Sequence, residues 1–237
     1  MNYLSLLDGL AVSFNDANKH TIIFGKPGSG KSLFFSSLLR ELEAKQLKFI
    51  VFDLKNSFIK NHYNPSIHRH NSPSNEELSI EAMKLWFRDP TKQFTGLFIS
   101  GQTSEYYLKS AIQYICSLSD YSDLPVHFVL DDTAFLQLSY DSLIALLTQG
   151  RSKGANIWLS YQSYYQLIQQ YDNNSRSILS VIQNYCSFAI GDDVTASLLQ
   201  TKLPGISSNE LSNLPALSGY AKFGKDSTIS FKVPFKC

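Results

Sequence analysis

Short apolar runs rich in β-branched and aromatic residues alternate along the chain with longer segments whose apolar residues recur at helical spacing. The short runs predict buried strands and the longer segments predict helices. The strands are expected over residues 9–14, 20–24, 48–53, 94–100, 125–132, 155–160, 185–190, 219–223 and 228–233. The helices are expected over residues 33–45, 74–87, 104–118, 138–150, 163–171 and 192–203, with one more before residue 185. Strands that alternate with helices predict an α/β fold with a mostly parallel sheet and helices on both faces.

Three segments break this alternation. The first strand, 9–14, is followed by turn residues at 15–19, which predicts a hairpin that leads into the strand at 20–24. The last two strands predict a C-terminal β-hairpin over the turn at 224–227. Residues 55–73 are rich in Asn, His, Pro and Ser without periodicity, which predicts a loop, part of a loop and helical excursion over 55–93.

Composition narrows the class of protein. The 237 residues suffice for a single α/β domain, 1–237, and a net charge of +1 gives no global basic field, although a local basic channel remains compatible with it. The apolar runs are too short for a transmembrane helix, and the N-terminus does not resemble a signal peptide. The three cysteines have no ligand spacing and are interpreted as reduced thiols of a cytoplasmic protein. The histidines of the 55–73 segment lack supporting Cys or carboxylate ligands, so a solvated loop is favoured over a metal site.

The segment between the strand at 20–24 and the helix at 33–45 matches the phosphate-binding pattern G-x-x-x-x-G-K-[ST]. Its residues are Gly25, Lys26, Pro27, Gly28, Ser29, Gly30, Lys31 and Ser32. The glycines allow successive backbone N–H groups to face one anion, and the helix N-terminus adds partial positive charge. Lys31 can reach the β- and γ-phosphates and Ser32 can ligate Mg²⁺. The sequence therefore predicts a site for a nucleoside triphosphate with Mg²⁺.

Two adjacent acids, Asp131 and Asp132, end an apolar strand, which places them at the carboxyl edge of the sheet, where ligands bind in open α/β folds. Beside a P-loop, Asp131 would hold the Mg²⁺ water shell, and Asp132 would orient or deprotonate the attacking water. The alternative is that the two acids cap the next helix.

Two further residues flank the strand at 155–160. Gln162 follows it and should lie beside the P-loop strand, where it would sense the γ-phosphate, unless it caps the next helix. Arg151 precedes the strand and should lie at the surface, where it could reach the nucleotide of a neighbouring subunit as an arginine finger, unless it is a solvated charge.

Taken together, these segments resemble the FtsK–HerA superfamily of DNA-pumping ATPases, P-loop NTPases of the RecA-like/ASCE type. The resemblance extends from about residue 9 to residue 223. The segments that carry it are GKPGSGKS (25–32), FIVFDLKNSF (49–58), VHFVLDD (126–132), GRSKGANIWLSYQS (150–163), NYCSFAIGDDVTASLL (184–199) and LPALSGYAKF (214–223). Lys31, Ser32, Asp131, Arg151 and Gln162 fall on the nucleotide-handling positions of that superfamily.

The resemblance implies an ATP-hydrolysing translocase of double-stranded DNA that uses ATP and Mg²⁺ and assembles as a homo-oligomer, a hexameric ring. Packaging of a viral genome into a capsid is ranked first, because the type IV coupling proteins of conjugation usually carry a membrane anchor and a helical insert that do not fit here. A capsid vertex or a membrane pore would be the protein partner, and the host cytoplasm or the virion vertex the location. The family usually has Asp-Glu where this chain has Asp131-Asp132, and aspartate is one methylene shorter.

Lys60, Arg69, Lys153 and Lys202 are candidate contacts to DNA phosphates. A rival hypothesis from another class is a P-loop protein that binds ATP as a switch or assembly factor without moving DNA. Stimulation of ATP hydrolysis by duplex DNA separates the two, because a motor should respond to its track and a switch should not.

Overall fold

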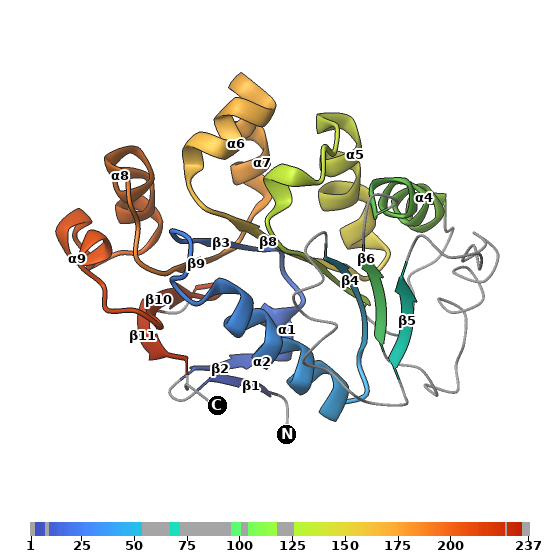
Figure 1. Cartoon of the computed structure of the whole chain (residues 1–237), viewed down its shortest axis with the longest axis horizontal. Helices are drawn as coiled ribbons and strands as arrows, with labels where there is room; N and C mark the ends of the chain where they lie inside the picture. The colour runs from blue at the N-terminus through green and yellow to red at the C-terminus, as the bar shows by residue number, and fades with distance from the viewer. Residues whose placement is uncertain are drawn as a thin grey trace.

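A nine-stranded sheet crosses the computed structural model of the chain, which describes residues 3–7, 10–53, 67–71, 96–100, 104–117, 126–225 and 227–233 (Figure 1). Its strands are β3 (Thr21–Phe24), β4 (Lys48–Asp53), β5 (Ile67–Asn71), β6 (Gly96–Ser100), β7 (Val126–Leu130), β8 (Ala155–Tyr161), β9 (Asn184–Ser187), β10 (Ser218–Lys222) and β11 (Ile229–Lys232). They are ordered β11-β10-β9-β3-β8-β7-β4-β6-β5. The seven strands from β9 to β5 pair in parallel, and β10 and β11 add an antiparallel C-terminal hairpin. The predicted fold class is confirmed.

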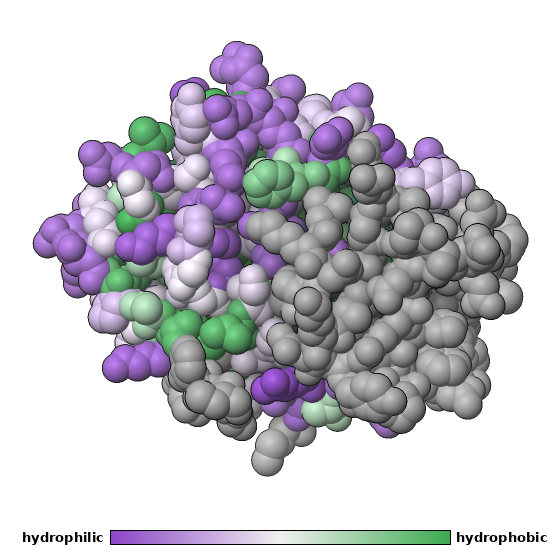
Figure 2. Space-filling model, in the orientation of Figure 1, coloured by the Kyte–Doolittle hydropathy of each residue, from purple (hydrophilic) through white to green (hydrophobic). Residues whose placement is uncertain are grey.

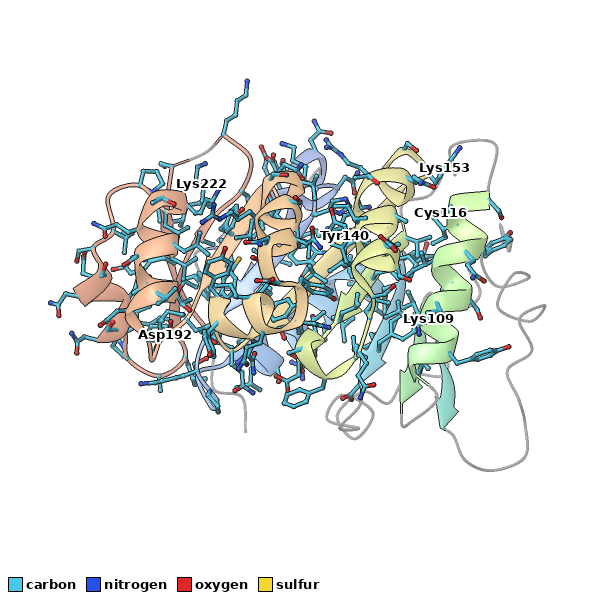
Figure 3. All side chains as sticks on the ribbon, turned by 90° about the horizontal axis from the view of Figure 1, so that it is seen from above. Lys109, Cys116, Tyr140, Lys153, Asp192 and Lys222 are labelled. Carbon is cyan, nitrogen blue, oxygen red and sulfur yellow. The ribbon has the colours of Figure 1, made fainter. Side chains whose placement is uncertain are left out.

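Helices cover one face of the sheet in a row, which Figure 3 shows from above. They are α4 (Ser104–Ser117), α5 (Tyr140–Ala145) with the π-helical turn η2 (Leu146–Gly150), α6 (Tyr164–Tyr171), α7 (Ser175–Val181), α8 (Asp193–Lys202) and α9 (Ser208–Ser212). The opposite face is covered by α2 (Lys31–Ala44) and by a separate two-stranded sheet of β1 (Tyr3–Leu7) and β2 (Leu10–Ser13) (Figure 1). Three short turns complete the described elements: α1 (Phe14–Ala17), η1 (Thr133–Phe135) and η3 (Asp172–Asn174).

The two faces of the sheet enclose two separate apolar cores, because successive side chains of a strand point to opposite faces. On β3, Ile22 and Phe24 pack on the side of α4 to α9, whereas Ile23 packs on the side of α2. Both faces of the central strands are buried, which explains why these strands are largely apolar without a regular alternation of polar residues. The register of β3 pairs Phe24 with Tyr161 of β8 and with Ser187 of β9, so the loop after Phe24 emerges beside the ends of both neighbouring strands.

The predicted hairpin between the first strand and the strand at 20–24 is wrong, because the first strand pairs with a different partner. The strand at the first predicted position, β2, pairs antiparallel with β1 and not with β3. The reason is an alternation that the sequence prediction passed over: Leu4 and Leu6 of β1 are buried in the same core as α2, and Tyr3 is exposed. A two-stranded ribbon that buries one face on a helix is stable without joining the main sheet.

The predicted loop at 55–73 is wrong over residues 67–71, which form the edge strand β5, parallel to β6. Its sequence, IHRHN, has no apolar alternation, and pairing to β6 through the backbone makes it a strand. The helix predicted over 74–87 and the remainder of the 55–93 excursion lie outside the described residues. The short helix α9, which begins with a capping box between Ser207 and Glu210, was not predicted.

Candidate functional site

The P-loop joins β3 to α2 at the carboxyl edge of the sheet, as its motif requires. Gly28 has φ 73° and Gly30 has φ 120°, conformations that favour glycine. A Cβ on Gly25 would lie 2.6 Å from the Ser29 Oγ and 2.8 Å from the Phe188 Cβ, so a side chain at residue 25 would displace the loop. The glycines of the motif are therefore required by this backbone for two different reasons, turn geometry and close packing.

Neighbouring segments hold the P-loop at two points. The Lys26 N–H donates to the Ala189 carbonyl after β9 (2.8 Å), and the Leu217 N–H before β10 donates to the Ser29 carbonyl (3.1 Å). Leu217 adopts a left-handed conformation with φ 63°, uncommon for leucine, and its side chain faces the Cα of Gly30. Sequence reasoning missed both supports, since a backbone hydrogen bond between distant segments leaves no pattern in either segment.

The inner surface of the P-loop has the character of an anion site. The Ser29 Oγ is buried without a hydrogen-bond partner, in a residue only 3% exposed, which is uncommon for a hydroxyl in a protein interior. The N-terminus of the 14-residue helix α2 directs its first N–H groups to the same place. The Lys31 ammonium lies over the loop and donates to the Gly25 carbonyl (2.6 Å) and the Lys26 carbonyl (3.3 Å). These groups fit the phosphates of a nucleotide.

Ser32, the last residue of the motif, meets the first strand-end acid. The Ser32 hydroxyl donates to the Asp131 carboxylate (Oγ–Oδ2, 2.9 Å), although the two residues are 99 positions apart. Burial raises the pKa of Asp131, helped by the charge of Asp132, against the hydrogen bonds from Ser160 and Ser32 and the charge of Lys31. A hydroxyl and a buried carboxylate beside a phosphate cradle are the oxygen ligands that Mg²⁺ takes together with phosphate oxygens. The residues present therefore fit the predicted Mg²⁺ site.

The second acid, Asp132, differs from Asp131 in its backbone conformation. It has φ 48° and ψ 49°, a left-handed conformation that Asp tolerates better than most residues. It occupies the N-cap position of η1, yet its side chain makes no capping hydrogen bond, so the structure does not favour the capping alternative. Its role as a base remains a prediction.

Gln162 follows β8, which pairs directly with the P-loop strand β3. The Gly25 N–H donates to the carbonyl of Tyr161, the residue before Gln162 (3.2 Å), so Gln162 lies beside the P-loop as expected. The cap of the next helix is Ser163, whose hydroxyl accepts from the Gln166 N–H. Because a neighbour performs the capping, the structure removes the alternative explanation for Gln162, and its sensing role remains a prediction.

Arg151 lies at the opposite edge of the sheet from the P-loop. It is exposed and precedes β8, whereas the P-loop and Gln162 follow the strands to which they are attached. The seven residues of β8 separate the two edges by about 20 Å at ~3.3 Å per residue. In Figure 3 the labelled Lys153, which precedes β8, lies at one edge of the sheet, and the labelled Asp192, which follows β9, lies at the opposite edge. Arg151 therefore cannot reach the P-loop of its own chain.

The structure thus brings together residues 25–32, Asp131, Asp132 and Gln162 and leaves Arg151 apart. Of the DNA-contact candidates, Lys60 lies outside the described residues, and Lys202 stacks over the Tyr185 ring, 5.3 Å from its centroid.

The described residues contain no cluster of three or more His, Cys, Asp or Glu side chains that could hold a metal. None of the described helices has the length and apolar character that crossing a membrane requires. On the face in Figure 2, hydrophilic residues dominate over the upper helices, and hydrophobic ones gather in small separate patches.

Two sequence families match parts of the chain. Residues 5–70 match the DNA-binding domain of the type IV secretion-system coupling proteins, and residues 125–203 match the TraM recognition site of TraD and TraG. These two ranges contain the P-loop, both strand-end acids, Arg151 and Gln162. No curated protein matches the sequence.

Solved structures match the fold at low sequence identity. The bacterial conjugative coupling protein TrwB superposes with a TM-score of 0.79 at 13% identity, covering 100% of this chain and 90% of that one, and it has been solved with a non-hydrolysable ATP analogue and with ADP and Mg²⁺. The DNA-packaging ATPase B204 of Sulfolobus turreted icosahedral virus superposes with a TM-score of 0.61 at 13% identity, covering 92% of this chain and 98% of that one. The resemblance to conjugative and packaging ATPases of the FtsK–HerA type, expected from the sequence, is confirmed by two matching segments and by a shared fold.

Proposed function

We propose that this chain is an ATPase that couples ATP hydrolysis to the translocation of double-stranded DNA. The observation that carries the ATPase part of the proposal is the hydrogen bond between Ser32 and Asp131, which joins the P-loop to the strand-end acid. A P-loop alone binds phosphate, whereas a P-loop hydroxyl paired with a buried carboxylate is the arrangement that P-loop NTPases use to hold Mg²⁺ on a nucleotide.

Each residue of the site has a distinct task in this proposal. The P-loop N–H groups and Lys31 bind the phosphates, and Ser32 and Asp131 hold Mg²⁺, which supplies positive charge against the phosphate oxygens. Asp132 accepts a proton from the attacking water, and Gln162 contacts the γ-phosphate from the adjacent strand. Arg151 reaches the nucleotide of the next subunit, a role that is supported by its exposure and by its distance from the P-loop of its own chain.

DNA as the partner is supported by the comparisons. The first matching family is a DNA-binding domain, and the matched viral structure is a DNA-packaging ATPase. Phosphate contacts spread over a homo-oligomeric ring, expected to be hexameric, would compensate for the small net charge of one chain, because the ring sums the contacts of all its subunits.

Packaging of a viral genome remains the first form of this function, as predicted from the sequence. Conjugative DNA transfer is the second candidate. It is favoured by both family matches and by the higher TM-score of TrwB, 0.79 against 0.61 for B204. Affinity capture with the proteins encoded by neighbouring genes separates the two: a capsid protein as partner supports packaging, and a membrane-pore protein supports conjugation.

The decisive experiment measures ATP hydrolysis with and without duplex DNA, together with electron microscopy of the chain with an ATP analogue and DNA. Stimulation of hydrolysis several-fold by duplex and rings threaded by DNA are the expected results. ATP binding without any response to DNA would instead support the rival hypothesis of a nucleotide-dependent switch.

A further inference from the structure

A fully buried hydroxyl lies between the two strand-end acids and has no role in the site as described above. Ser160, on β8, donates from its Oγ to the Asp131 Oδ1 (2.5 Å) and accepts on the same Oγ from the Asp132 N–H (2.8 Å). One hydroxyl of β8 is thus bonded to the carboxylate of Asp131 and to the backbone N–H of Asp132, the two residues that follow the neighbouring strand β7.

The first effect of Ser160 is on the two oxygens of Asp131. Oδ1 accepts from the Ser160 hydroxyl and also from the Asp132 N–H (3.0 Å), which it shares with the Ser160 Oγ. Oδ2 accepts from the Ser32 hydroxyl at the P-loop. Ser160 therefore fixes the rotation of the carboxylate and leaves Oδ2 as the oxygen presented to the phosphate cradle.

The second effect is on the backbone of Asp132. Its left-handed conformation is held by the hydrogen bond from its N–H to Ser160, and a second brace lies beside it. The buried Thr133 hydroxyl donates to the Leu130 carbonyl (2.8 Å) and accepts from the Ser160 N–H (3.2 Å). Together these bonds lock the turn after β7 to the end of β8, so the direction of the short Asp132 side chain is set by β8.

We propose that Ser160 is a positioning residue that aims Asp131 Oδ2 at Mg²⁺ and holds the turn that presents Asp132. The inference rests on the proposed function, because both place Mg²⁺ at Ser32 and Asp131. Ser160 is two residues from Gln162, so the brace also ties the strand that senses the γ-phosphate to the pair of acids.

The test measures the affinity of the full chain for a fluorescent ATP analogue, mant-ATP, in Mg²⁺ and in EDTA, without hydrolysis. In the Ser160→Ala variant we expect the affinity in Mg²⁺ to fall about tenfold, the effect of one lost hydrogen bond to a charged group. The affinity in EDTA should change less than about threefold, because the phosphate contacts of the P-loop are untouched. Ser160→Thr keeps the hydroxyl and should restore the Mg²⁺ dependence.

The matched control is Ser187→Ala. Ser187 is a fully buried serine at the carboxyl end of β9, on the other side of β3, and its hydroxyl donates to the Phe188 carbonyl (2.9 Å). The Ser187→Ala variant should leave the ratio of the mant-ATP affinities in Mg²⁺ and in EDTA unchanged. If Ser160→Ala does not fold by circular dichroism, Ser160→Cys, of similar size and a weak donor, replaces it.

Equal losses in Mg²⁺ and in EDTA, or no loss in either, would overturn the positioning role while leaving the proposed function intact. A wild-type chain that binds mant-ATP in neither condition would instead overturn the proposed function, and the inference with it.

Discussion

Replacing Lys31 by alanine is expected to abolish ATP hydrolysis while leaving the fold intact. The Lys31 side chain is 7% exposed, and its ammonium donates to the Gly25 and Lys26 carbonyls. Losing hydrogen bonds from a charged donor costs about 1–3 kcal/mol, and relief of the burial of the charge offsets part of that cost. For a chain of this size, the melting temperature should fall by no more than about 8 °C.

The effect on catalysis should be far larger, because the same ammonium stabilises charge on the reacting phosphates. Removing one such donor lowers kcat by about 10²–10³-fold. The assay is phosphate release at saturating ATP and Mg²⁺, beside a thermal melt of each variant. Lys45→Ala is the matched control, since it removes the same side chain at the C-cap of the same helix. Normal turnover in Lys31→Ala would refute the assignment of the P-loop as a hydrolytic site.

Three further predictions follow from the geometry. Mixing Arg151→Ala with Lys31→Ala subunits should restore part of the hydrolysis at intermediate ratios, since some interfaces then pair an intact P-loop with an intact finger; activity absent at every ratio would exclude a finger in trans. Gly25→Ala should weaken ATP binding at least tenfold, because the added Cβ would lie 2.6 Å from the Ser29 Oγ, and an unchanged affinity in equilibrium titration would show that the loop yields. Burial lowers the pKa of His20 to about 4, with the charge of Arg151 adding to the effect and the Leu147 carbonyl opposing it. The stabilisation from neutral His20 is therefore complete above pH 6.5 and is lost as the pH falls toward 4, by about 3 kcal/mol. In denaturant melts, the free energy of unfolding of His20→Gln should fall less steeply with decreasing pH than that of the wild type. An equal dependence on pH would contradict this prediction.

Most of the fold could be predicted because the central strands are buried on both faces. The segments that form β3, β4 and β8 are largely apolar runs rich in β-branched and aromatic residues, so their positions can be predicted from the local sequence. The fold prediction failed where the local sequence does not show which strands pair through their backbones. β5 has Ile67 as its one apolar residue and so shows no apolar alternation, and the alternation in β1, whose Leu4 and Leu6 are buried beside α2, does not show which strand pairs with β2.

In the candidate site, too, the residues that a local sequence pattern identifies could be predicted, and those that act through distant contacts could not. Residues 25–32 and Asp131 were predictable because phosphate and Mg²⁺ demand particular residue types at fixed places after strands. Ser160 and Leu217 were not, since their importance lies in hydrogen bonds to segments far away in the sequence. A serine within an apolar strand carries a weak signal, because a buried hydroxyl must have a partner, but the sequence does not say which.

The length of β8 has a consequence for how the activity scales with the amount of protein. A strand of seven residues holds Arg151 and the P-loop apart within one chain, so if Arg151 acts on bound nucleotide, as we propose, a solitary chain cannot bring the two together. Turnover per chain at saturating ATP should then rise with protein concentration and level off once neighbours are always present. Dilution would therefore lower ATP hydrolysis per chain, and ATP would be hydrolysed only where enough copies of the chain have assembled.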